Sequence, residues 1–256
     1  MSRIAFAAAL ISTTCIAGVA QADTLAALVG DNSIVLIDSD TGKASKGMTI
    51  TGASGRVIGI DVRPADGMLY AVTADGVAWT VNATSGAATR KSKFDMPLPQ
   101  VEAFVVDFNP VADRLRLMGA DGTNLRINVD DGKVTKDGQL KFAESDMHKG
   151  EKPNVVAGAY TNSMKGTKET TLFNIDMTIG GLLKQAPPND GVLNAVGKLG
   201  VMPKTAAFDI PPSGNVGWLV ADGAVHKVDL MTGKATKVSD VSGVTGAVRD
   251  IAIMAK

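Results

Sequence analysis

A short turn recurs along the chain, beginning with Asp38-Ser-Asp-Thr-Gly42 and repeated at Asn82-Ala-Thr-Ser-Gly86. The later copies are Asn128-Val-Asp-Asp-Gly132, Asp176-Met-Thr-Ile-Gly180 and Asp229-Leu-Met-Thr-Gly233. The side chain of Asp or Asn accepts hydrogen bonds from backbone amides of its own turn, and Gly adopts a positive φ without strain. Apolar, β-branched residues precede each copy, as in residues 33–37 and 77–81. The pattern therefore predicts a series of hairpin turns between β-strands.

A second signature precedes most of these turns by about twenty residues. It reads Gly59-Ile-Asp-Val-Arg-Pro64, Val105-Val-Asp-Phe-Asn-Pro110 and Ala207-Phe-Asp-Ile-Pro-Pro212, an apolar strand that ends in Asp before a proline turn. Together the two signatures outline units of four antiparallel strands, and the turns begin 44 to 53 residues apart. That length and strand count are typical of a propeller blade. We predict an all-β fold, a β-propeller of about five four-stranded blades; a barrel and a two-sheet sandwich are the alternatives.

The two ends of the chain are expected to share one blade. The first unit begins too late to contain an inner strand, because residues 24–28 already match the second strand of the other units. Residues 248–254 form an additional strand with Asp250 in register with the other inner aspartates. We therefore expect this C-terminal strand to complete the first blade and close the ring, which removes open sheet edges.

The first residues have the pattern of a secretory leader. Arg3 precedes an apolar run over residues 4–19, and Ala20-Gln21-Ala22 supplies small residues before a cleavage site. This predicts a signal peptide over residues 1–22, a single propeller domain over residues 23–256, and a periplasmic or secreted location. The only cysteine, Cys15, lies in the leader, so the mature domain is expected to contain none.

Composition excludes several function classes. The chain has 26 basic and 26 acidic residues, which gives no basic field for nucleic acid and none for anionic lipid, and we expect no membrane insertion after leader cleavage. Without cysteines, thiol catalysis and cysteine-ligated metals are excluded from the mature domain. The two histidines, His148 and His226, lie far apart in the sequence. No Gly-x-Ser-x-Gly nucleophile motif and no phosphate-binding loop is present.

Several motifs together resemble a known family. They are Gly59-Ile-Asp-Val-Arg-Pro64, Asp107-Phe-Asn-Pro110, Asn124-Leu-Arg-Ile-Asn128, Ala159-Tyr-Thr-Asn162 and Gln185-Ala-Pro-Pro-Asn-Asp-Gly191. The chain resembles a family of exported bacterial propeller-like proteins that is filed as a domain of unknown function and is distantly similar to YVTN and WD40-like propellers. The resemblance implies a propeller and an envelope location, and it implies no activity.

Four aspartates occupy equivalent positions at the inner strands: Asp61, Asp107, Asp209 and Asp250. Ala159 interrupts the series in the fourth unit. Carboxylates that converge on the central channel would supply oxygen ligands for a hard cation, and Ca²⁺ is the cofactor that this pattern suggests. The alternative is structural: each Asp caps the following turn or pairs with an arginine such as Arg63.

A second set of residues is a candidate ligand site. Forked guanidinium groups recognise carboxylates and phosphates, and arginines cluster in the second and third units; the alternative is that they neutralise buried aspartates. The loop that begins at Gln185 is held by two prolines and exposes amide groups, so it is either a recognition loop or a well-formed turn between outer strands. The predicted ligand-binding residues are Arg63, Arg126, Tyr160, Asn162, Gln185 and Asn189.

These observations predict a binding or scaffold propeller without catalytic activity, whose partner is an envelope protein or a small ligand. The alternative function is a metal-dependent hydrolase or lactonase-like enzyme, with a cation held by the channel aspartates.

Overall fold

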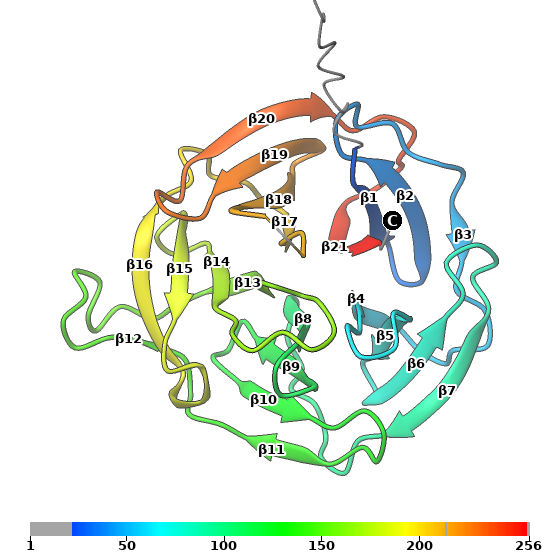
Figure 1. Cartoon of the computed structure of the whole chain (residues 1–256), viewed down its shortest axis with the longest axis horizontal. Coiled ribbons are helices and arrows are strands. Elements are labelled where there is room, and N and C mark those ends of the chain that lie inside the picture. Colours follow the sequence, from blue (N-terminus) through cyan, green and yellow to red (C-terminus); the bar gives the residue numbers. More distant parts are fainter. Residues whose placement is uncertain (1–21, 213, 255–256) are drawn as a thin grey trace, which may run out of the picture.

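Five β-sheets surround a common axis in the computed structural model, which describes residues 22–212 and 214–254 (Figure 1). The prediction of a five-bladed β-propeller is confirmed. Within the described ranges the one helix is a 3-10 turn, η1 (Pro188–Asp190), and no helix there is long and apolar enough to cross a membrane. The predicted leader lies outside the described residues except for Ala22.

Three blades follow the predicted pattern of four antiparallel strands in chain order from the axis outward. Blade 2 comprises β4 (Val57–Val62), β5 (Leu69–Thr73), β6 (Val77–Val81) and β7 (Ala88–Lys93). Blade 3 comprises β8 (Phe104–Asn109), β9 (Arg114–Gly119), β10 (Asn124–Ile127) and β11 (Val134–Lys136). Blade 5 comprises β17 (Ala206–Asp209), β18 (Val216–Ala221), β19 (Ala224–Asp229) and β20 (Ala235–Asp240).

Blade 1 joins the two ends of the chain, as predicted. Its innermost strand is β21 (Val248–Met254), followed outward by β1 (Thr24–Val29), β2 (Ser33–Asp38) and β3 (Met48–Thr49). The β21 and β1 strands are antiparallel, with Met254 opposite Thr24 and Ile251 opposite Ala27. The ring is therefore closed by hydrogen bonds between segments from opposite ends of the chain.

Blade 4 departs from the predicted repeat. It comprises β13 (Val155–Tyr160), β14 (Leu172–Asp176), β15 (Gly181–Gln185) and β16 (Val192–Lys198), and β12 (Lys141–Phe142) adds a fifth strand parallel to β16. The turn that begins at Asp176 joins the second strand to the third, whereas the other four turns join the third to the fourth. Its assignment as an equivalent copy was wrong, because an Asx-Gly turn can connect any two adjacent antiparallel strands. The equivalent connection in blade 4 is residues 186–191.

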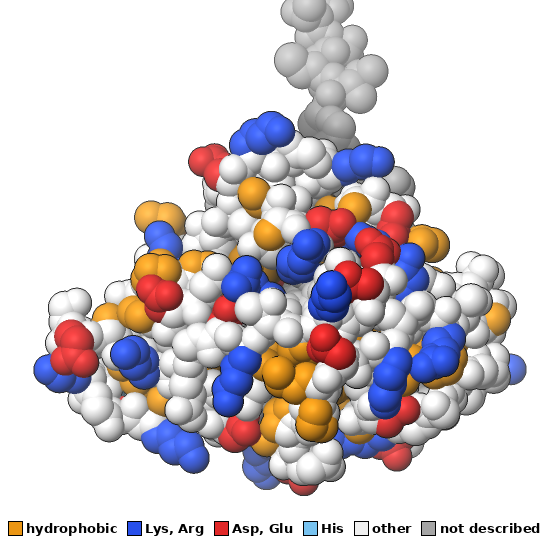
Figure 2. Space-filling view, turned by 90° about the horizontal axis from the view of Figure 1, so that it is seen from below, with side chains coloured by type: hydrophobic (Ala, Val, Ile, Leu, Met, Phe, Trp, Pro, Cys, Tyr) orange, Lys and Arg blue, Asp and Glu red, His pale blue; other side chains and the backbone are white. Residues whose placement is uncertain are grey.

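The apolar core is divided among five clusters, one at each junction between neighbouring blades. At the junction of blades 2 and 3, for example, the rings of Tyr70 and Phe108 meet edge to face with centroids 5.2 Å apart. The inner strands of each blade are buried on both faces of the sheet. This explains why their sequences are apolar throughout and do not alternate between apolar and polar residues. From the side, the molecule is broad at one end of the axis and narrow at the other, with acidic and basic side chains interspersed (Figure 2).

The recurrent turns of blades 1, 2 and 3 also hold each of these blades to the one before it. The segment that leaves the outer strand of the preceding blade donates a backbone hydrogen bond to the turn, and the three bonds are Ser242 N to Gly42 O at 2.9 Å, Thr51 N to Gly86 O at 2.9 Å and Asp95 N to Gly132 O at 3.0 Å. At Gly132, φ is +76°, and a Cβ there would overlap the carbonyl oxygen of Lys93. This turn glycine is therefore required both for its conformation and for the close approach of the neighbouring backbone.

Candidate axial pocket

The inner strands of all five blades begin around one end of the axis and enclose a pocket there. Its volume is about 300 Å³. We call it the axial pocket, and its lining residues are Ile58, Glu102, Ala103, Phe104, Asn154, Val156, Met177, Lys204, Thr205, Ala206, Val248 and Arg249. Five apolar members come from the first two residues of the five inner strands, Ala103 directly precedes β8, and Met177 lies in the turn after β14. Glu102, Asn154 and Lys204 come from the connections that precede the inner strands. The pocket therefore combines an apolar floor with a polar rim.

Arg249 is the most constrained charged group of the axial pocket. Its Nη1 donates to the carbonyl oxygens of Gly30 at 2.7 Å and Val57 at 3.0 Å, which fixes the guanidinium against the backbone. Burial lowers the pKa of Arg249, and the nearby positive charge of Arg56 lowers this pKa further. Among the described residues, no ion pair joins Arg249, Arg56 or Lys204 to an acid. The guanidinium thus lies at the pocket without a direct salt bridge, although Asp31, Asp250 and Glu102 are close enough to raise its pKa in part.

The four predicted aspartates form a ring of buried side chains around the axis, which we call the aspartate ring (Asp61, Asp107, Asp209 and Asp250). Each carboxylate accepts a hydrogen bond from the backbone of the next blade around the ring. The four bonds are Ile60 N to Asp250 Oδ2 at 2.8 Å, Phe108 N to Asp61 Oδ2 at 2.6 Å, Tyr160 N to Asp107 Oδ1 at 2.9 Å and Ile253 N to Asp209 Oδ2 at 2.7 Å. The ring therefore connects blades, and Ala159 leaves the junction of blades 4 and 5 to apolar packing.

The structural alternative is right in part. Arg63 pairs with other acids and not with Asp61, which contradicts the predicted pairing. The Oδ1 atoms of Asp61, Asp209 and Asp250 do accept a hydrogen bond from the amide of the following residue, while the other oxygen of each reaches the next blade. Burial raises the pKa of all four, that of Asp209 to about 7. In the part of the chain that the structure describes, no group of three or more His, Cys, Asp or Glu side chains is placed to hold a metal ion. The Ca²⁺ assignment stays a prediction without a ligand set.

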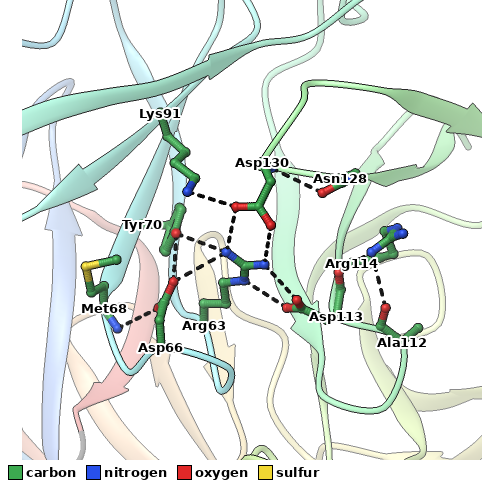
Figure 3. A network of polar contacts seen from close by, with 10 residues as sticks. All are labelled: Arg63, Asp66, Met68, Tyr70, Lys91, Ala112, Asp113, Arg114, Asn128 and Asp130. Carbon is green, nitrogen blue, oxygen red and sulfur yellow. Dashed lines mark hydrogen bonds and ion pairs between the residues drawn. The ribbon is translucent and has the colours of Figure 1, made fainter.

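Arg63 lies in a cluster of ion pairs at the junction of blades 2 and 3 (Figure 3). Its guanidinium contacts Asp113 at 2.6 Å and Asp130 at 2.8 Å, both from blade 3, and it also bonds Asp66 and Tyr70 of its own blade. These partners raise the pKa of Arg63, and together with Lys91 the arginine holds the pKa of Asp130 well below its ordinary value. Because protein groups already accept hydrogen bonds from its donors, Arg63 connects blade 2 to blade 3.

Arg116 was absent from the predicted ligand residues, yet it brings several of them together. It is 1% exposed and donates to Tyr160 Oη at 3.2 Å, Asn189 Oδ1 at 2.8 Å and Asp137 Oδ2 at 2.6 Å. A fourth bond reaches Asn124 Oδ1 at 2.8 Å. We call Arg116 with these four partners the Arg116 cluster. The signal was in the sequence, because an arginine within the apolar strand β9 must be neutralised by buried partners.

The remaining predicted ligand residues also make intramolecular contacts. Arg126 forms a two-pronged pair with Asp137 at 2.7 and 2.9 Å, and Gln185 donates to the carbonyl of Pro188 at 2.7 Å. Asn162 has a φ of +57° and donates to the carbonyl of Glu169 at 3.1 Å. None of the six predicted residues lines the axial pocket. The loop that begins at Gln185 is the turn between β15 and β16, tied to blade 3 by Arg116.

The fold and this pocket define the class: a small five-bladed β-propeller with a cavity at one end of its axis. Residues 17–252 match the family model of a domain of unknown function, DUF4394, and the chain belongs to this family. A comparison with curated protein sequences found no match.

Solved structures share the architecture at low sequence identity. One is a structural-genomics protein of unknown function from Bacteroides thetaiotaomicron VPI-5482, with 16% identity and a TM-score of 0.53; the match covers 91% of the present chain. The chain spans 64% of the length of that protein, less than two thirds. Another is the extracellular domain of a putative hybrid two-component system from B. thetaiotaomicron, with 12% identity, a TM-score of 0.44, and coverage of 86% of this chain and 28% of that one. The first likeness supports the fold alone.

Proposed function

We propose that the protein is an exported binding propeller, periplasmic or secreted, that takes a small ligand in the axial pocket. The observation that carries the proposal is the pocket itself, an apolar-floored cavity of about 300 Å³ to which all five inner strands contribute. Ligand sites are typically concave and mostly apolar, with a few polar groups that fix orientation. The leader-like segment over residues 1–22 supports the exported location.

The pocket is supported by a rigid frame. The aspartate ring holds the inner strands together beneath it, and the outer turns add a second set of hydrogen bonds between blades. Because each of the five inner strands contributes its first residues to the lining, that part of the cavity does not need to form on binding. A site of this kind binds without a large ordering cost.

The test is a fragment screen by ¹H–¹⁵N NMR on the mature domain. Fragments that bind should shift amide signals of Phe104, Val156 and Val248, and V156W should abolish these shifts by filling the cavity. V111W is the matched control, since Val111 is 48% exposed and does not line the axial pocket. A screen with no hits at the axial pocket, or hits that V111W removes and V156W does not, would refute the proposal.

The hydrolase or lactonase-like alternative requires a cation at the aspartate ring. No specific observation favours it, because an oxygen of each ring carboxylate already accepts a backbone hydrogen bond from the next blade.

A further inference from the structure

The cations that line the axial pocket form no salt bridge with any residue that the structure describes. Arg249 and Lys204 line it, and Arg56 is close enough to Arg249 to lower the pKa of that group. Glu102 is the one acid among the lining residues, and it is exposed. Asp31 adds a second exposed acid near Arg249, and Asp222 is an exposed acid close enough to Lys204 for their charges to interact. The cations of the pocket therefore have acids in their surroundings, but among the described residues no carboxylate lies within ion-pair distance of Arg249 or Lys204.

The positions of these groups separate the pocket into two parts. Ile58 and Phe104 are 2% and 5% exposed and form part of the apolar floor. Val156 and Met177 continue this apolar surface from blade 4. Arg249 is bound to carbonyl oxygens through Nη1, and no hydrogen bond to another described residue uses its Nε or Nη2. A molecule on the apolar floor thus has unused guanidinium donors beside it.

We propose, on the basis of the binding function above, that the ligand of the axial pocket is an amphipathic organic anion, a carboxylate with an apolar body. The carboxylate lies at Arg249 and Lys204, and the apolar body lies on Ile58, Phe104 and Val156. A guanidinium recognises a carboxylate with two parallel hydrogen bonds, a geometry that an alcohol or an amine does not offer. The cavity volume lies at the lower end of the range for ligand pockets, which suits a small molecule.

Three probes of equal chain length test the charge: octanoate, 1-octanol and octylamine. Titration of the mature domain by ¹H–¹⁵N NMR should give octanoate an affinity about ten- to a hundred-fold higher than that of 1-octanol, the effect of one charge-assisted hydrogen bond. Octylamine should bind more weakly than either. Higher salt should weaken the binding of octanoate and leave that of 1-octanol unchanged.

Variants then assign the selectivity to the proposed groups. R249M should reduce the difference between octanoate and 1-octanol to less than about threefold, and R90M, which removes an exposed arginine of β7 outside the pocket, should leave it intact. Because Arg249 also holds two backbone carbonyls, K204M provides a second variant whose side chain makes no hydrogen bond or ion pair to a described residue. It should reduce the same difference, while a spectrum otherwise like wild type shows that the fold is kept.

The outcomes separate the inference from the proposed function. Equal affinities for octanoate and 1-octanol, or tighter binding of octylamine, would overturn the anion assignment and leave a binding pocket in place. Fragment hits of other classes at the pocket, with no response to octanoate, would do the same. Octanoate selectivity that survives in both R249M and K204M would also overturn the assignment. An axial pocket that binds no probe and no fragment would remove the proposed function itself.

Discussion

Replacement of Arg116 by methionine should cost the domain about 3 to 5 kcal/mol of unfolding free energy. The guanidinium is 1% exposed and makes four hydrogen bonds of 2.6 to 3.2 Å to Tyr160, Asn124, Asp137 and Asn189. Removing one member of a buried ion pair typically costs roughly 3 to 5 kcal/mol, because the partner stays buried. Each uncharged partner that loses its donor adds a smaller penalty, on the order of 1 kcal/mol.

Asp137 limits the loss. Its side chain is 4% exposed, and it keeps the two bonds from Arg126 at 2.7 and 2.9 Å when Arg116 is removed. The double variant R116M/R126M leaves this carboxylate without either arginine. We therefore expect the double variant to be less stable than the sum of the two single effects, by about 1 kcal/mol or more.

The assay is equilibrium unfolding of the mature domain in urea, followed by the fluorescence of Trp79 in blade 2 and Trp218 in blade 5. R90M is the control, since Arg90 is exposed on β7, and it should change stability by less than about 0.5 kcal/mol. A loss below about 1 kcal/mol in R116M, or strict additivity in the double variant, would refute the description of Arg116 as the joint between blades 3 and 4.

Three further predictions concern pH, the recurrent turn and export. Burial raises the pKa of Asp209 to about 7, so the folded state binds this proton more tightly than the unfolded state does. The protonated side chain therefore contributes roughly 4 kcal/mol of stability below about pH 4. This contribution is lost as the pH rises through 7. The urea concentration at the midpoint of unfolding should therefore fall between pH 4 and pH 8, and it should fall less steeply with pH in D209N. A midpoint that rises with pH would contradict this prediction. G132A should destabilise the domain by about 2 kcal/mol more than G67A, because both glycines have positive φ but only at Gly132 does a Cβ overlap backbone; equal urea midpoints would show that the close approach is unimportant. Expression of the full chain in a Gram-negative host should yield periplasmic protein whose N-terminal sequence begins at Asp23. A protein that begins at Ala22 would count against the predicted cleavage site, and so would an intact chain that stays in the cytoplasm.

Sequence alone was sufficient for the ring but not for every blade. The Asx-Gly turns predicted the number of blades. The position of Asp250, in register with the other inner aspartates, predicted the pairing of β21 with β1. The same turn chemistry misplaced the Asp176 turn, because local conformation does not identify which strands a turn joins. The parallel strand β12 was not predicted, since two residues carry no periodic signal.

The candidate site was harder to predict for a related reason. Glu102, Asn154 and Lys204 come from three different connections that share no motif, and only the closed ring brings them together. Asp61 and its equivalents did share a motif, and the structure gives that motif a role between blades. A repeated residue in this fold thus indicates what every blade needs, whereas the pocket is formed from residues that differ from blade to blade.

The position of β21 has a consequence for biosynthesis. The last seven described residues supply the innermost strand of blade 1 and its aspartate, so a nascent chain that ends before Val248 has four complete blades and one unfinished sheet. The unpaired edge of β1 then remains open to any other extended segment. Closure of the ring is thereby tied to the synthesis of β21, and a premature stop codon just before Val248 would yield a product prone to aggregation.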